Sequence, residues 1–543
     1  MPKVKDNLYK LQRNLYDYMK KKAMSYESEP SKDLVQYSAD QKKFSKRKFE
    51  LSDLSELLKS IARSDIIYLG DFHTFDQSSR NMERILRTLI NIKRKNLSLG
   101  VEFVHQHKQK YIDQFLNNFI TEHEFLESIE YHESWHFPWN HYRFFFQMAK
   151  KHNLKIIALN TVGTLSKRDT IASEIIETHF DKNPQSTLLI LFGELHIVPD
   201  KLPTFVQEKK PLLVQTIIHQ NLDDIFWKLK ENQRENQVVK YNDLEFSIQS
   251  SPPWVKYESM IYWYENLLED PEFEIHEYVM DSGLMTFNST VFDTFNYITE
   301  KLSSTYSLNF AKEELEDFNL YDHSKMDYLL TLIDKLPNVS DQALYKKLIT
   351  TGRSFKLPET RVYYCPNYSI NRIAFLAGLH IQELFHVKFS VTFKEKKDIT
   401  SEMIQLIYQL TIGYFSSKVI NPYRKCNLYQ DLLKEAQAKG TDEERSKDIM
   451  LALSIIDLQY SKDEFIKSAL RGKSRFQLYR SARIIGYLFG DILYDNFYEH
   501  DNKNLESLLR VIFDYPDDEI KFDHFKWTVL PRNKYKSYKK RFF

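Results

Sequence analysis

Short apolar runs alternate with longer amphipathic segments between about residues 65 and 220, and this alternation constrains the fold most. The apolar runs, each of strand length, are Ile66–Gly70, Leu97–Glu102, Lys155–Asn160, Thr187–Gly193 and Leu212–Ile218. Segments with a helical period of apolar residues lie between them, near 77–95, 104–119, 122–131, 139–152 and 168–181. Strands that alternate with helices predict an α/β fold, a mostly parallel sheet flanked by helices.

The rest of the chain divides around this α/β segment. We predict a helical N-terminal extension at 1–62, the α/β domain at 63–225, a connecting segment at 226–280 and a predominantly α-helical C-terminal domain at 281–543. Within the extension, the polar residues 27–48 are expected to form a loop or linker. The sequence leaves the role of the helical half open: it is expected to cover the α/β face, bind a partner or form a homo-oligomer.

Charge and composition exclude several classes of protein. The 76 Lys and Arg balance 75 Asp and Glu, so we expect no nucleic-acid partner. Two cysteines, Cys365 and Cys426, are too few for an all-thiolate zinc site or an iron–sulfur cluster. No run of 18 apolar residues occurs, so no membrane span is expected. Because residues 1–60 lack a signal-peptide core and an early lipid-attachment cysteine, the expected location is cytoplasmic.

Histidines gather in the α/β segment, which holds 11 of the 17, from His73 to His219. Two predicted strands, the first and the fourth along the chain, run into the same G-[DE]-x-H tetrapeptide, at 70–73 and at 193–196, and the second strand ends at Glu102. In parallel α/β sheets, ligands bind where the carboxyl ends of the strands meet the loops. We therefore expect His73, Glu102 and His196 to lie close together.

A count of three helices between the second and third strands brings a further loop to this face. The loop at 132–139 contains His132 and His136 in an H-E-x-x-H pattern. Because Pro138 disfavours a continuous helix there, we interpret the pattern as a loop that lines the site and not as a zinc-protease helix. The residues expected to converge are His73, Glu102, His132, His136, Asn160, Arg168 and His196.

Two kinds of chemistry suit such a face. Two histidines and a carboxylate (His73, Glu102 and His196) are a competent first shell for a divalent metal. Histidine is also a common axial ligand of haem iron. The candidate cofactor-binding residues are His73, His196, His132 and His136. The candidate catalytic residues are Glu194, Asp71, Arg168 and Asp169, with Glu194 or Asp71 as general base.

The order of these motifs resembles the ChaN-like group of the Tiki/TraB superfamily over about residues 65–220. The matching positions are Leu69–His73, Val101–Phe103 with Gln109 and Asp113, Trp139 with Tyr142, Ile156–Asn160, Arg168 and Asp169 with Ala172, and Gly193–His196. The resemblance implies an α/β core and a site that contains His73, Glu102 and His196. The chain departs from the ChaN pattern because it lacks a lipid-attachment cysteine and carries a large helical C-terminal half.

Members of this superfamily differ in function, so the resemblance implies two hypotheses. ChaN-like proteins are associated with haem binding and iron uptake, which implies a haem- or iron-binding protein with a porphyrin or another small-molecule ligand. Tiki proteins are metal-dependent proteases, and erythromycin esterases hydrolyse with a histidine/glutamate site. They imply a hydrolase that uses the same three residues with a divalent metal (Zn, Mn, Co or Fe), or a histidine base alone. Whether the chain is an enzyme stays open at this point.

Overall fold

The computed structural model describes residues 2–27, 29–92, 96–232, 237–267, 289–391, 398–458, 465–498, 505–530 and 537. The chain forms two compact units, of which one comprises Met1–Leu15 with Leu284–Lys540 and the other mainly Tyr16–Gly283. The domain limits expected from the sequence stay predictions.

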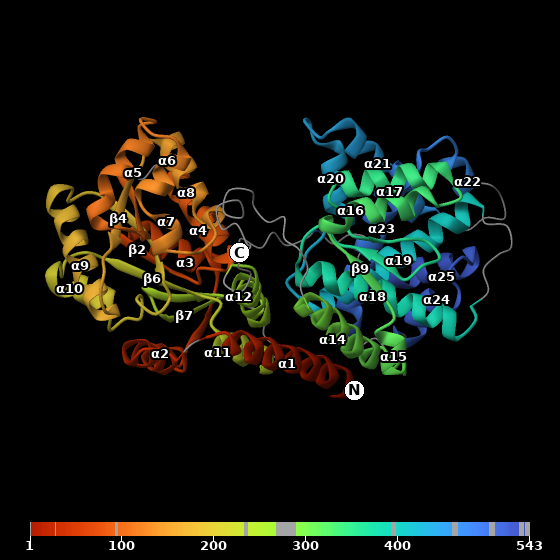
Figure 1. Ribbon diagram of the computed structural model, residues 1–543, viewed down its shortest axis with the longest axis horizontal. Coiled ribbons are helices and arrows are strands. Elements are labelled where there is room, and N and C mark those ends of the chain that lie inside the picture. Colours follow the sequence, from red (N-terminus) through yellow and green to blue (C-terminus); the bar gives the residue numbers. More distant parts are fainter. Residues whose placement is uncertain are drawn as a thin grey trace. The chain divides into compact units, whose positions relative to one another are not determined.

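An eight-stranded, mostly parallel sheet forms the centre of the second unit (Figure 1). Its order is β1-β7-β8-β6-β2-β5-β3-β4, and only the pairs β1–β7 and β7–β8 are antiparallel. The strands are β1 (Glu50–Ser52), β2 (Ile66–Asp71), β3 (Leu97–His105), β4 (Lys155–Asn160), β5 (Thr187–Gly193), β6 (Gln215–Gln220), β7 (Val238–Asn242) and β8 (Glu245–Ile248). The α/β prediction is therefore confirmed.

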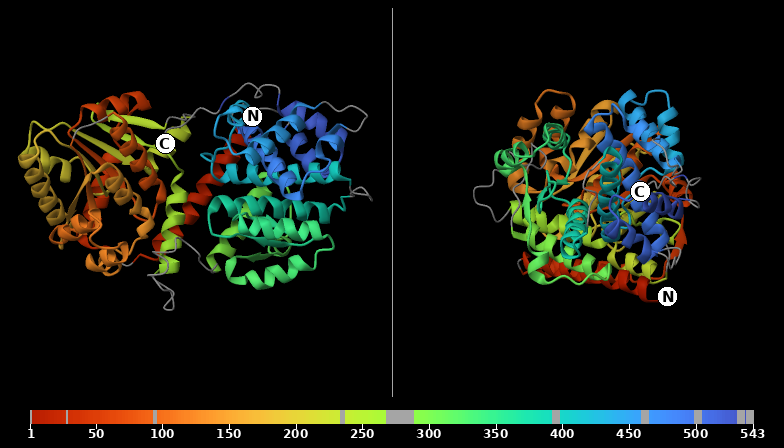
Figure 2. Two further views of the ribbon diagram at one scale, coloured as in Figure 1. Left: turned by 90° about the horizontal axis from the view of Figure 1, so that it is seen from above. Right: turned by 90° about the vertical axis from the view of Figure 1, so that its right-hand side faces the viewer.

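Helices cover both faces of this sheet (Figures 1 and 2). Every residue of β2 and β5 is buried, as expected for central parallel strands covered on both sides. Successive residues of β2 alternate between two apolar clusters, with Ile67 and Leu69 in one and Ile66 and Tyr68 in the other. The helices that follow α2 (Lys32–Ser45) in this unit are α3 (Leu54–Arg63), α4 (Asp76–Asn91), α5 (Gln109–Leu116), α6 (Glu122–Ser128), α7 (Tyr131–Ser134), α8 (Arg143–His152), α9 (Leu165–Lys182), α10 (Leu202–Lys209), α11 (Asp223–Glu231) and α12 (Pro253–Leu267).

The prediction of a loop or linker at 27–48 is wrong, because most of that stretch forms helix α2 (Lys32–Ser45). Ser31 caps this helix by accepting a hydrogen bond from the backbone N–H of Leu34 at 3.2 Å. Most of its polar residues are exposed or half-buried, while Tyr37 and Ser45 are buried. The polar composition misled the sequence prediction, since these two buried residues anchor the helix.

The other unit is predominantly helical, as predicted. A Cβ atom on Gly486 would lie 2.6 Å from the Cβ atom of Leu410, so α19 (Ile399–Ile420) and α23 (Arg475–Tyr498) pack with almost no space between their backbones. In the part of the chain that the structure describes, no helix is long and apolar enough to cross a membrane. The elements are α1 (Pro2–Ser25), whose first residues belong here, α14 (Ser289–Thr305), α15 (Lys312–Leu315), β9 (Asn319–Tyr321), α16 (Met326–Asp334), α17 (Val339–Thr350), β10 (Phe355–Lys356), β11 (Val362–Tyr364), α18 (Ile370–Lys388), α19 (Ile399–Ile420), α20 (Tyr429–Gln437), α21 (Glu443–Asp457), α22 (Phe465–Leu470), α23 (Arg475–Tyr498), α24 (Leu505–Asp514) and α25 (Glu519–Val529).

Candidate functional site

His73 follows β2 and is held by the last residue of that strand. Its Nδ1 lies 2.9 Å from Asp71 Oδ2, which also accepts a hydrogen bond from the Tyr142 hydroxyl at 3.0 Å. The other oxygen, Asp71 Oδ1, lies 3.0 Å from His141 Nε2. Asp71 is buried, so its two oxygens are committed to these three partners. The carboxylate therefore orients the His73 ring and leaves Nε2 as the ring nitrogen that faces away from Asp71.

His196 has a similar arrangement at the end of β5. Its Nδ1 lies 2.5 Å from Oδ1 of Asp169, a fully buried residue in the first turns of α9. The other oxygen, Asp169 Oδ2, accepts a hydrogen bond from the Tyr37 hydroxyl of α2 at 2.7 Å. The Tyr37 ring also packs edge-on against the His196 ring, with centroids 5.6 Å apart. Two Asp–His pairs thus stand at the carboxyl ends of β2 and β5.

Glu102 of β3 lies between the two pairs. Its Oε2 accepts a hydrogen bond from the Gly193 N–H at 2.6 Å, and its Oε1 accepts one from the guanidinium of Arg168. Arg168 also donates from Nε to Asn160 Oδ1 at 2.9 Å. His196 Nε2 lies 3.8 Å from Glu102 Oε1. Each Glu102 oxygen therefore has a hydrogen-bond donor within the protein.

Three of the predicted site residues meet above Gly193. A Cβ atom placed on this glycine would lie 3.2 Å from Glu102 Oε2, 3.4 Å from His196 Cδ2 and 3.6 Å from His73 Cε1. The parallel register explains the meeting, because Asp71 pairs directly with Gly193. A glycine suits this position because the three side chains occupy the space that a side chain would need.

Electrostatics keep the two carboxylates of the site ionised. Burial alone would raise the pKa of Asp71, but hydrogen bonds and charge from His141 and His73 lower it well below its usual range. Burial would likewise raise the pKa of Glu102, yet the Arg168 guanidinium and the neighbouring imidazoles lower it. For His73, burial would lower the pKa, and the Asp71 carboxylate raises it above the ordinary value. Asp71 is therefore a hydrogen-bond acceptor and an orienting group.

Glu194, the other candidate base, belongs to a different cluster. Its Oε1 lies 2.6 Å from Nδ1 of buried His219, whose Nε2 lies 3.3 Å from Glu245 Oε1. Arg47 donates from Nη1 to Glu245 Oε2 at 3.1 Å. The structure therefore places Glu194 with His219, while Asp71 lies with His73. The catalytic roles of Asp71, Glu194, Arg168 and Asp169 stay predictions.

The loop after α7 reaches His73 through its aromatic residues. Trp135 and Phe137 pack on the His73 ring, with centroids 4.7 and 4.8 Å away. His136 is exposed and accepts a hydrogen bond at its backbone oxygen from Trp263 Nε1 at 3.0 Å. His132 is half-buried in α7. The role of these two histidines in cofactor binding stays a prediction.

Sequence reasoning missed several residues of the site. Tyr37 lies in the stretch expected to be a loop, and Trp263 lies in the predicted connecting segment, where it stacks on Phe137 at 4.7 Å. His141 was part of the histidine cluster but no motif singled it out. The Trp139/Tyr142 motif was the one signal that pointed to Tyr142, which holds Asp71.

A divalent metal fits this donor set poorly. Among the described residues, no group of three or more His, Cys, Asp or Glu side chains is placed to hold a metal ion. The reason lies at Glu102, whose oxygens are hydrogen-bonded to Gly193 and to the cation of Arg168. Metal ligation by His73, Glu102 and His196 stays a prediction that would require Arg168 to move.

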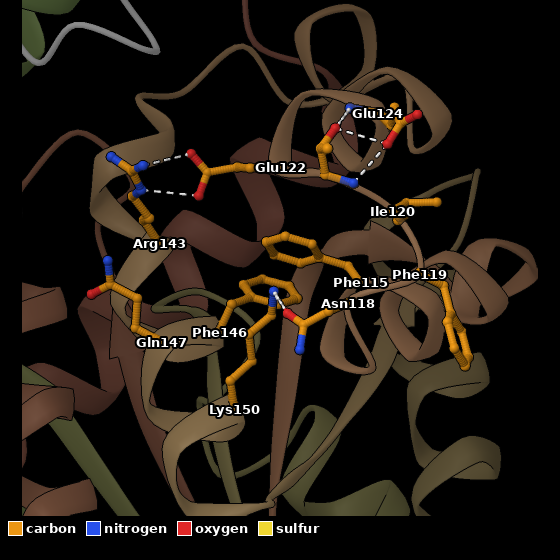
Figure 3. Close-up of a pocket in the computed structure, with 11 residues that line it drawn as sticks. Phe115, Asn118, Phe119, Ile120, Glu122, Glu124, Arg143, Phe146, Gln147 and Lys150 are labelled. Carbon is orange, nitrogen blue, oxygen red and sulfur yellow. Dashed lines mark hydrogen bonds and ion pairs between the residues drawn. The ribbon is translucent and has the colours of Figure 1, made fainter.

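A pocket of about 470 Å³ lies among residues of α5, α6, α8 and the α5–α6 connection (Figure 3). None of the predicted site residues lines it. Arg143 donates to Glu122 at 2.9 Å, and Lys150 donates to Asn118 Oδ1 at 2.9 Å. Both cations of the pocket thus have partners within its own wall.

Replacing Tyr37 with phenylalanine is expected to lower the free energy of unfolding by about 2 kcal/mol, since a hydrogen bond to a buried carboxylate is lost. Tyr131→Phe is the matched control, because the Tyr131 hydroxyl is also buried but makes no hydrogen bond within the described structure. Denaturant unfolding of both variants checks this. Equal effects of the two substitutions would contradict the role of Tyr37 in holding Asp169.

His219 predicts a pH-dependent contribution to stability. Burial alone would lower its pKa, but Glu194 and Glu245 raise it to about 9. A folded pKa above the unfolded value means that the contribution is complete below about pH 6.5 and is lost as the pH rises through 9. In His219→Gln, the free energy of unfolding should therefore fall less between pH 6.5 and 9.

The control for this measurement is His179→Gln. Burial lowers the pKa of His179 to about 4, so this residue is neutral in the folded protein across that pH range. Because a histidine of the unfolded chain titrates near about pH 6.5, the substitution should leave the slope of stability against pH unchanged above about pH 7.5. A His219→Gln slope equal to that of the wild type would show that His219 does not titrate in this way.

A comparison with known protein families agrees with the motif order. The family described as haem-binding uptake, Tiki superfamily, ChaN matches residues 57–168. A solved structure, described as cofacial haem binding to ChaN of Campylobacter jejuni, is similar at 15% identity and a TM-score of 0.25, covering 32% of this chain and 87% of that one. No curated protein matches. Residues 57–168 are therefore assigned to the ChaN-like family of the Tiki superfamily.

Proposed function

We propose that this chain binds haem at the face where His73, Glu102 and His196 meet, and that His73 Nε2 would hold the iron. The proposal rests on two properties of the His73 side chain, its partial exposure and the contact of its Nδ1 with Asp71. Its side chain is 23% exposed, although its Nδ1 is held by the buried carboxylate of Asp71. Histidines that ligate metals almost always donate their second ring nitrogen to a carboxylate, a carbonyl or a water.

The surroundings of His73 also suit a flat apolar ligand. Trp135 and Phe137 flank the ring, and Trp263 of α12 stacks on Phe137. Sites for cofactors are mostly lined by apolar and aromatic side chains, with a few polar groups that set orientation. The family description that matches residues 57–168 names haem binding and supports the same ligand.

Each residue would have a defined part in this function. Bound haem would supply an iron centre whose reactivity depends on its axial ligand. Asp71 would fix the orientation of the His73 ring, and Tyr142 would hold Asp71 in place. Trp135 and Phe137 would exclude water from one side of the porphyrin.

Haemin titration of the purified protein tests the proposal. A saturable shift of the Soret band at one haemin per chain is expected, and it should be unchanged in His152→Ala, since His152 is an exposed residue at the end of α8. Metal analysis of the same preparation belongs to the experiment. Absence of a saturable shift would overturn the proposal.

A hydrolase is the second candidate, and the His196–Asp169 pair favours it. A buried imidazole with Nδ1 on a carboxylate is the arrangement of an oriented general base. Stoichiometric zinc, manganese, cobalt or iron without haemin affinity would favour this alternative in its metal-dependent form. The cytoplasmic location and a homo-oligomer remain predictions.

A further inference from the structure

Two histidines at the end of β3 have no part in the site described so far. His105 is half-buried, His107 is exposed, and their ring centroids lie 5.7 Å apart. The pairing of β3 with β4 shifts register between Val101 and His105. Such irregularities re-aim side chains and are frequent beside active sites.

A short chain of contacts connects His105 to the floor of the site. His105 pairs with Asn160 in the sheet, and Asn160 Oδ1 accepts a hydrogen bond from Arg168 Nε. Arg168 in turn holds Glu102, one of the three side chains above Gly193. The two histidines therefore lie at the rim of the face that contains His73.

The fixed charges of this rim are already paired. Arg168 binds Glu102, and Lys108 Nζ lies 2.8 Å from Glu130 Oε2. Burial, helped by His107, lowers the pKa of His105. An imidazole N–H near the cations of Arg168 and Lys108 is a suitable hydrogen-bond donor for an incoming carboxylate.

We propose that His105 and His107 bind a carboxylate at the edge of the porphyrin and thereby select anionic, carboxylate-bearing tetrapyrroles. This inference rests on the proposed function, because it places the porphyrin against His73. Haem carries its two propionates on one edge of the ring, so a rim on one side of His73 would also fix the orientation of the ring. Neither imidazole is needed to ligate the iron.

Metal-free protoporphyrin IX and its dimethyl ester are the probes, because they separate the carboxylates from iron ligation. The wild type should bind the free acid about 10-fold more tightly than the ester, as expected when one charge-assisted hydrogen bond is made. In the His105→Gln/His107→Gln double variant this preference should vanish, with the affinity for the ester unchanged. The matched control is His123→Gln/His152→Gln, which replaces exposed histidines on α6 and α8.

The outcomes separate the two proposals. Equal binding of the free acid and the ester by the wild type would overturn the proposal that His105 and His107 bind a carboxylate. A double variant that loses affinity for the acid and for the ester equally would overturn it as well. Should the double variant fold poorly, His107→Gln alone can be measured, because His107 is exposed. This variant should show a smaller preference for the free acid over the ester. An unchanged preference would overturn the proposed carboxylate binding. The preference should persist in His73→Ala. A wild type that binds neither porphyrin nor haemin would overturn the proposed function together with the rim.

Discussion

Replacing His73 with alanine is expected to weaken haemin binding by about 100-fold or more and to remove the Soret shift. The substitution deletes the proposed iron ligand, whereas loss of a group that merely supports a ligand already costs about 10- to 100-fold. The aromatic wall of Trp135 and Phe137 would remain and would retain weak, non-ligated binding. Titration of the variant against the wild type and His152→Ala measures the difference.

The expected loss is specific to the iron. Because the wall and the rim are unchanged, His73→Ala should bind metal-free protoporphyrin IX as well as the wild type does. Equal haemin affinity in His73→Ala and the wild type would show that another residue ligates the iron. An equal loss of haemin and of the metal-free porphyrin would indicate that His73 supports the shape of the face instead.

Replacing Arg168 with methionine is expected to lower the free energy of unfolding by about 3 kcal/mol or more. Glu102 is buried, and Arg168 is the cation that hydrogen-bonds it, so the substitution leaves a buried carboxylate without its counter-ion. The Arg168→Met/Glu102→Gln double variant should recover at least half of the loss. Chemical denaturation of the three variants, with Glu102→Gln alone, provides the measurement.

The pH dependence of this effect follows from the lowered pKa of Glu102. A lowered folded pKa contributes stability that is complete above the unfolded value of about 4.3 and is lost as the pH falls through the folded value. The difference between the wild type and Arg168→Met should therefore be largest near neutral pH and shrink below about pH 4. A difference that is constant down to acid pH would contradict this account of the Arg168–Glu102 pair.

Most of the α/β fold followed from local sequence pattern. Buried parallel strands need continuous apolar residues, so the runs at 66–70, 155–160 and 187–193 revealed β2, β4 and β5 almost to the residue. The same logic placed His73, Glu102 and His196 together, because their strands lie side by side and end at one edge of the sheet.

The partners of those residues depend on tertiary contacts that no local pattern reveals. Tyr37 donates a hydrogen bond to Asp169, which lies 132 positions later in the chain. The stretch of sequence around Tyr37 is polar and gives no sign of this contact. Trp263 belongs to α12, a helix that does not follow a predicted strand, so the convergence of strand ends could not place Trp263 beside Phe137. Glu194 follows the same glycine turn as His196, yet its carboxylate pairs with His219 of β6, which lies on the far side of β2 from β5.

Pulsed electron paramagnetic resonance of the ferric haem complex, prepared with ¹⁵N-labelled histidine, identifies the residue that ligates the iron. We expect coupling of the iron to a histidine nitrogen in the wild type and in His196→Ala, and loss of that coupling in His73→Ala. Coupling that persists in His73→Ala, or a wild-type complex without a histidine nitrogen on the iron, would contradict ligation by His73.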